Sequence, residues 1–228
     1  MACIKTLIRL SLILSVGLAM GAAPASADDQ SKAQGVVDKM AESFNNLSAD
    51  PNMGWFRDNL KNAQAVMILR QFRAGFIIGG SGGSGVMLSR DAQGKWSHPA
   101  FYGMGSGSIG FQVGAEGSEV ALLIMTQKGR DALLSTDVKL GGDISVAAGP
   151  VGAGAKAATT DVLSFSRSKG IYGGVSLEGM VIGPRSSLNH AYYDQGVSPL
   201  DILVNQTVQN PGANDLVAAV TKLASTGK

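Results

Sequence analysis

Basic side chains are concentrated in the middle of this chain. Between positions 61 and 95 the only acidic residue is Asp91, while the same stretch holds five basic residues: Lys61, Arg70, Arg73, Arg90 and Lys95. Arg167 and Lys169 flank a serine in the later run SFSRSKG. Such a cluster could neutralise phosphate, and each basic group near an anionic membrane surface contributes about 1 kcal/mol. The alternative interpretation is a solvated rim of a sheet, which needs no ligand.

A second candidate for chemistry is Ser81, because residues 79–83 match the nucleophile elbow G-x-S-x-G. An elbow requires a strand, a sharp turn and then a helix. Residues 86–88 (VML) follow here and are typical of a strand. His98 and His190 are the only histidines that could serve as the base, and their settings favour structural roles. A serine hydrolase using Ser81 is therefore the less favoured alternative.

Other catalytic signatures fail on their context. Gly105-x-Gly107-x-x-Gly110 matches a dinucleotide fingerprint, but strand-like residues follow where a helix is required. No phosphate-binding G-x-x-x-x-G-K-[ST] run occurs, and the two histidines are 92 positions apart, which is not a metal-ligand spacing. Cys3 is the only cysteine. We therefore expect no catalytic residue, no metal site and no cofactor.

Two glycine-rich runs, at 73–90 and 102–114, must position these basic residues. Apolar residues stand between their glycines and proline is absent, so neither run resembles a flexible linker. Glycine inside a strand often marks a bend, or a place where another backbone or a ligand approaches closely. Gly103, Gly105 and Gly107 recur at every second position and would share one face of a strand. We predict strands for both runs.

The remaining pattern predicts an α+β fold. Short β-prone runs separated by turns follow from position 65, and no long helices interleave with them, which argues against a parallel sheet. We expect a strongly curved antiparallel sheet or partial barrel with N- and C-terminal helices packed on it. The predicted helices span 32–47, a segment opened by Pro51, 127–135, 187–194, 199–208 and 213–224.

The N-terminal segment is typical of an export signal. Lys5 and Arg9 precede the apolar stretch 10–20, and Ala25-Ser26-Ala27 matches an A-x-A cleavage site. We therefore expect a cleaved signal peptide at 1–27 and a periplasmic mature protein. Removing Lys5 and Arg9 from 19 basic and 17 acidic residues leaves 17 of each, so bulk charge gives no reason to expect nucleic-acid binding.

Several segments in order resemble the SYLF domain family, also described as a lipid-binding and yeast-type actin-binding family. They are RAGFIIGGSGGSGVMLSR, GKWSHPAFYGMGSGSIGFQVGAE, LGGDISVAAGPVG and FSRSKGIYGGVSLEG, and the likeness runs from about Ala63 to Leu203. The resemblance implies a SYLF-type lipid-binding domain with C-terminal helices at 63–228, preceded by the N-terminal helices that the residue pattern predicts at 28–62. It also implies a module without known catalysis. Arg73 stands where the family has a basic residue, and Arg167 and Lys169 match its S-R-S-K-G turn.

The resemblance and the predicted compartment together suggest the ligand. Eukaryotic members bind phosphoinositides and in some cases actin, but a periplasm argues against both. Many bacterial members are lipoproteins, whereas Cys3 precedes the apolar stretch and does not fit a lipid-anchor site. We expect a non-enzymatic protein that recognises anionic phospholipid at a membrane surface, peripheral to the membrane. The expected headgroup-binding residues are Arg73, Arg167, Lys169, Arg70, Arg90 and Lys95. A cell-envelope protein-interaction or structural module is the alternative.

Overall fold

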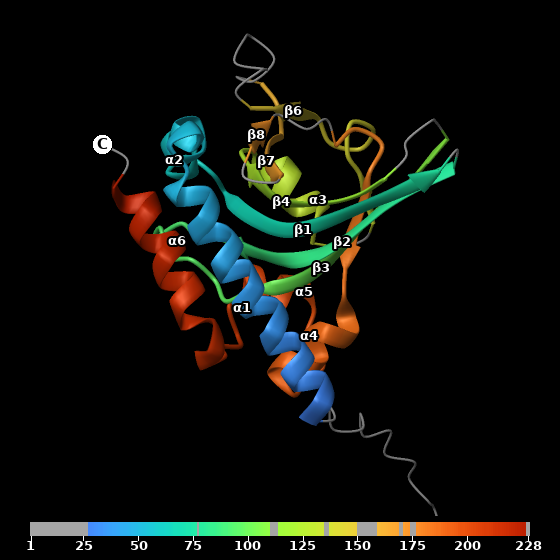
Figure 1. Ribbon diagram of the computed structural model, residues 1–228. Helices are drawn as coiled ribbons and strands as arrows, with labels where there is room; N and C mark the ends of the chain where they lie inside the picture. Colours follow the sequence, from blue (N-terminus) through green and yellow to red (C-terminus); the bar gives the residue numbers. More distant parts are fainter. Residues whose placement is uncertain are drawn as a thin grey trace, which may run out of the picture.

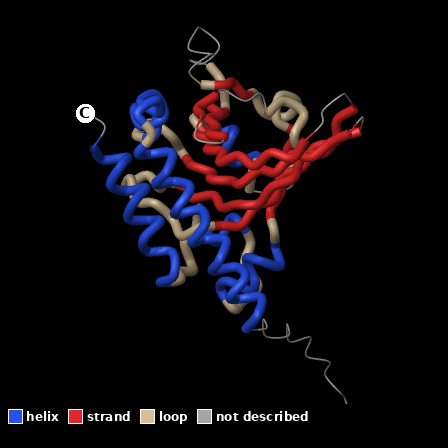
Figure 2. The backbone as a smooth tube through the Cα atoms, viewed as in Figure 1, coloured by secondary structure: helices blue, strands red, loops and turns tan. Residues whose placement is uncertain are grey.

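The computed structural model describes residues 27–76, 78–109, 114–134, 137–149, 159–168, 171–173 and 177–226. These residues form one mixed sheet with helices from both ends of the chain packed beside it (Figure 1). Figure 2 shows the strands gathered in one sheet, with most of the helices on one side of it. The predicted α+β class, with a curved and mainly antiparallel sheet, is confirmed.

Nine strands of the described chain follow the order β5-β9-β3-β2-β1-β4-β7-β6, and β8 pairs with β7. The four long central strands are β1 (Ala65–Phe76), β2 (Ile78–Ser89), β3 (Ala100–Ile109) and β4 (Gly114–Ile124). The shorter ones are β5 (Val138–Lys139), β6 (Val146–Ala148), β7 (Val162–Ser168), β8 (Ile171–Gly173) and β9 (Val181–Pro184). Every ladder is antiparallel except β6 with β7.

Helices from both ends lie against one face of this sheet, which we call the outer face and which carries Ile68 and Arg70. The N-terminal elements are α1 (Ala27–Ala49), the 3-10 turn η1 (Pro51–Met53) and α2 (Gly54–Leu60). Their buried residues include Val37, Met40, Phe44 and Leu47, which recur at helical spacing. Pro51 opens the 3-10 turn rather than the second helix itself, and Asp50 caps it through the Asn52 amide.

The later helices are α3 (Gln127–Ala132), α4 (Ser186–Tyr193), α5 (Pro199–Leu203), η2 (Pro211–Ala213) and α6 (Asn214–Thr226). The helix expected at 199–208 is shorter than predicted. It begins with a capping box between Ser198 and Asp201 and ends at Leu203, and Gln206 then takes a positive φ of 49°. The amide of Thr207 turns back to the carbonyl of Asp201 at 3.0 Å, which closes the segment as a turn.

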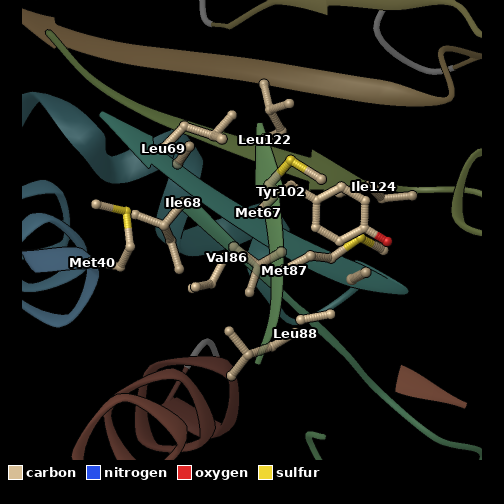
Figure 3. Packing of buried hydrophobic residues seen from close by; sticks show 14 of the residues in the cluster. Met40, Met67, Ile68, Leu69, Val86, Met87, Leu88, Tyr102, Leu122 and Ile124 are labelled. Carbon is tan, nitrogen blue, oxygen red and sulfur yellow. The ribbon is translucent and has the colours of Figure 1, made fainter. Parts of the chain in front are cut away.

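Apolar side chains fill both sides of the central strands. On the outer face Met40 of α1 lies beside Ile68 and Val86 (Figure 3). On the opposite side, which we call the inner face, Met67, Met87 and Tyr102 are buried, and the Tyr102 hydroxyl donates to the Leu133 carbonyl at 2.7 Å. Burial raises the pKa of this hydroxyl, which therefore stays protonated.

Two inner-face glycines permit the close approach of β1 and β2. A Cβ at Gly85 would overlap the carbonyl oxygen of Ile68, and one at Gly83 would lie 2.6 Å from that of Arg70. Only glycine avoids these clashes while the strands coil around one another. The sequence predicted that something approaches the 73–90 run closely. At Gly83 and Gly85 it is the backbone of the neighbouring strand β1.

Candidate functional site

A row of charged residues crosses three strands on the outer face. Glu119 of β4 is the register partner of Arg70 on β1 and of Arg167 on β7. Its carboxylate lies 3.6 Å from the Arg70 guanidinium and 3.3 Å from that of Arg167. One carboxylate therefore balances two of the predicted headgroup-binding residues.

Both arginines also hold the N-terminal elements on the sheet. Arg70 donates to Glu42 at 2.7 Å and to the Ser43 hydroxyl at 2.9 Å, both on α1. Arg167 lies 3.3 Å from the buried carboxylate of Asp50, which caps η1. These contacts give Arg70 and Arg167 a structural role in fastening α1 and η1, a role the sequence did not indicate.

Arg73 lies three positions further along β1 than Arg70, on the inner face. Its register partners are Ser81 and Glu116, and it is partly exposed. No carboxylate of the described residues lies within 4.0 Å of its guanidinium, and Glu116 instead accepts a hydrogen bond from Ser168. Arg73 is therefore a cation whose charge is available to a ligand.

Arg90 and Lys95 lie near the far end of β2 from Ser81. The Arg90 guanidinium donates to the Lys61 carbonyl at 2.7 Å and stacks 5.8 Å from the centre of the Trp96 ring. Lys95 is exposed in the turn that follows. Lys169 lies outside the described residues. The five described members of the predicted set thus occupy three separate places rather than one patch.

Arg185 is a cation that the sequence reasoning missed. It precedes α4 and is exposed, and its side chain lies over Gly103 of β3, where an added Cβ would meet Arg185 Cδ at 3.2 Å. Within the described chain, no carboxylate lies within 4.0 Å of it. The pairing of Gly103 with Gly183 brings Arg185 to this position. The two paired glycines are 80 positions apart, so no local sequence pattern predicts the contact.

An exposed aromatic side chain lies on the same face of the sheet as Arg185. Phe72 of β1 is 56 % exposed on the outer face, beyond the row of Arg70. Its register row contains Gly117 on β4, Gly82 on β2, Gly105 on β3 and the 40 % exposed Val181 on β9. Figure 1 shows that this end of the long strands extends past α1. We call the part of the outer face along this row the glycine face.

Ser81 is not in a nucleophile elbow. It lies inside β2, which continues as a strand to Ser89, and its hydroxyl is 2.8 Å from that of Ser106 on β3. His98 accepts a hydrogen bond from the Asn210 amide at 3.2 Å, and burial lowers its pKa, so it is a neutral structural residue near pH 7. These contacts supply no base for Ser81.

Two further kinds of feature are absent from the described residues. They hold no group of three or more histidine, cysteine or acidic side chains that could bind a metal ion. None of their helices is long and apolar enough to span a membrane.

Comparison with known proteins places this architecture in a family. Residues 105–223, about half of the chain, match a family model named Ysc84 and described as "Las17-binding protein actin regulator". The chain belongs to the Ysc84 (SYLF) family. The resemblance drawn from the glycine-rich and SFSRSKG segments is thereby confirmed.

Curated relatives of the Ysc84 family share about a third of their aligned residues with this chain. The human "SH3 domain-containing YSC84-like protein 1" is 32 % identical over 163 residues, which cover 69 % of this chain and 48 % of the relative. The yeast "LAS seventeen-binding protein 3" is 34 % identical over 170 residues, or 70 % of this chain and 36 % of the relative. The chain therefore matches half or less of the length of these relatives.

Proposed function

We propose that this Ysc84-family chain is a non-enzymatic periplasmic protein that binds anionic phospholipid at a membrane surface. The observation that carries the proposal is the exposed Phe72 together with Arg185, which lies on the same face of the sheet and has no ion pair among the described residues. An exposed apolar side chain with a basic group on the same face suits an interface where acyl chains meet phosphate. Arg73 keeps the role expected from the sequence, and Arg185 replaces the ion-paired Arg70 and Arg167.

Co-sedimentation with vesicles tests the proposal. We expect binding to vesicles of phosphatidylcholine mixed with phosphatidylglycerol, weakening with added salt, and little binding to phosphatidylcholine alone. Loss of one basic group costs about 1 kcal/mol, so Arg73→Gln should weaken binding about fivefold. Lys95→Gln removes the same charge near the far end of β2 and serves as the matched control. Equal binding to both kinds of vesicle would contradict the proposal.

A protein partner in the cell envelope is the second candidate function. The observation that favours it is the names of the relatives, which describe binding to the protein Las17 and regulation of actin. A photo-crosslinking residue at position 72, introduced in living cells, separates the two candidates. Lipid adducts identified by mass spectrometry support the first, and a single specific protein adduct supports the second.

A further inference from the structure

Two of the exposed large apolar side chains of the described residues lie in one row of the glycine face. Phe72 on β1 and Val181 on β9 are joined across the sheet by Gly82 on β2 and Gly105 on β3. Neighbouring strands are about 4.8 Å apart, so three steps separate the two backbones by about 14 Å. Side chains stand roughly perpendicular to a sheet. Phe72 and Val181 therefore stand on either side of two glycines, and we call this arrangement the glycine channel, with Phe72 and Val181 as its walls and Gly82 and Gly105 as its floor.

The packing of this chain does not require glycine in the floor. A Cβ at Gly82 or Gly105 would have its nearest neighbour at 3.9 or 3.8 Å, an ordinary van der Waals distance, and neither residue has a positive φ. Gly83 and Gly85 differ, because there the adjacent strand occupies the space. Glycine weakens a strand interior and often marks close approach by a ligand, so the floor suits an occupant from outside the fold.

The channel becomes polar toward the helices. In the next row Arg185 lies over Gly103, and the Asp137 side chain lies over its partner Gly183. The Asp137 carboxylate is nevertheless more than 4.0 Å from the guanidinium of Arg185. In the same row, on β1, Arg70 is paired with Glu42 and Glu119. Along the strand direction the surface therefore passes from charged to apolar.

We propose that the glycine channel holds one acyl chain of a phospholipid, with the lipid phosphate against Arg185. This deepens the proposed function and rests on it. A smooth apolar floor with the cation Arg185 in the next row complements an amphiphile that carries a phosphate. Backbone groups between β1 and β9 are already paired within the sheet, so an extended peptide finds no free edge there. A helix about 10–12 Å across is too wide for the space left between the walls.

A soluble lipid tests the channel separately from membrane attachment. We would titrate the mature protein with dihexanoylphosphatidylglycerol below its micelle concentration and follow binding by native mass spectrometry and NMR. The double variant Gly82→Val with Gly105→Val fills the floor with side chains that favour strands, so thermal unfolding should show a fold at least as stable. We expect this variant to bind the lipid at least tenfold more weakly.

Gly117→Val is the matched control. Gly117 lies in the same row, and a Cβ there meets nothing within 4 Å, but it is on the other side of Phe72 from the channel. It should bind the soluble lipid like the wild type. Arg185→Gln should bind it several-fold more weakly, whereas Lys222→Gln on α6 should not.

The possible results separate the two proposals. Absence of soluble-lipid binding by the wild type, or unchanged binding by the filled-floor variant, overturns the glycine channel even when vesicle binding persists. Soluble-lipid binding that the filled floor abolishes, without any binding to vesicles, supports the channel and overturns attachment to membranes. A specific protein adduct at position 72 in place of lipid overturns both.

Discussion

The carboxylate of Glu119 lies 3.3 Å from the guanidinium of Arg167, its register partner on the neighbouring strand. Glu119 also accepts a hydrogen bond from Asn46 of α1 at 3.0 Å and is only 16 % exposed. Removing its charge leaves Arg167 beside the single acid Asp50 in a partly buried setting. We expect Glu119→Gln to lower the free energy of unfolding by about 1–2 kcal/mol, measured by urea denaturation.

Glu42→Gln provides the comparison. Glu42 pairs with Arg70 at 2.7 Å, but its side chain is 63 % exposed, so water screens the pair. The loss should be within about 0.5 kcal/mol. Equal losses for the two variants would contradict a fastening role for the Glu119 row.

Glycines on the two faces of the sheet should respond in opposite ways to alanine. Gly85→Ala places a methyl group on the Ile68 carbonyl, and we expect a loss of about 3 kcal/mol in the free energy of unfolding. Gly105→Ala places a methyl group at an ordinary van der Waals distance, 3.8 Å, from its nearest atom, and the reduced freedom of the unfolded chain should stabilise the fold by about 0.5 kcal/mol. Thermal unfolding of both variants checks this, and a loss at Gly105 would show that the fold itself needs that glycine.

The strand pattern of the glycine runs was predictable because it is local. Alternation placed Gly103 and Gly105 on one face, and the structure agrees. The lengths of α1 and α5 were predicted less well, because helix ends depend on caps and turns. Gln206, for example, adopts a left-handed conformation that no propensity indicates.

The arrangement of the charges could not be read from the sequence. Arg70 and Arg73 are three positions apart in a strand, so they face opposite sides of the sheet. Which of them meets an acid depends on the pairing of β1 with β4, and on a helix that brings Glu42 across from an earlier part of the chain. Arg185 reaches the glycine face only through the pairing of β9 with β3. These contacts depend on how strands distant in the sequence are paired. A count of basic residues in one sequence window does not predict that pairing.

Asp161 should make stability depend on pH in the acid range. Burial alone would raise the pKa of its carboxyl, but hydrogen bonds from Thr126 and Ser145, together with Lys128, outweigh burial and lower the pKa to about 2. The group therefore contributes stability above the unfolded pKa near 3.8, and that contribution is lost as the pH falls toward 2. Its size at neutral pH is about 2 kcal/mol.

Urea denaturation of the wild type and Asp161→Asn from pH 7 to pH 2 measures this contribution. The variant should be less stable by about 2 kcal/mol near pH 7, and the gap should narrow below pH 4 as the wild-type carboxyl is protonated. Asp58→Asn, at an exposed position on α2, should show no such gap. A difference that stays constant across the range would mean that hydrogen-bond geometry, rather than ionisation, sets the effect.

Asp137→Asn should strengthen the binding of an anionic lipid in the glycine channel. Its carboxylate lies over Gly183, beside the position where Arg185 would meet the phosphate, so it repels the incoming anion. Removing an exposed charge changes the interaction by about 0.2–1 kcal/mol. We therefore expect the affinity for dihexanoylphosphatidylglycerol to rise up to about fivefold at low salt, and by less at high salt.

The affinity for zwitterionic dihexanoylphosphatidylcholine should rise less, because its choline cation is attracted by the same carboxylate. Asp215→Asn on α6 removes the same charge away from the channel and should leave both affinities unchanged. Weaker binding of the anionic lipid by Asp137→Asn would place its phosphate elsewhere on the molecule.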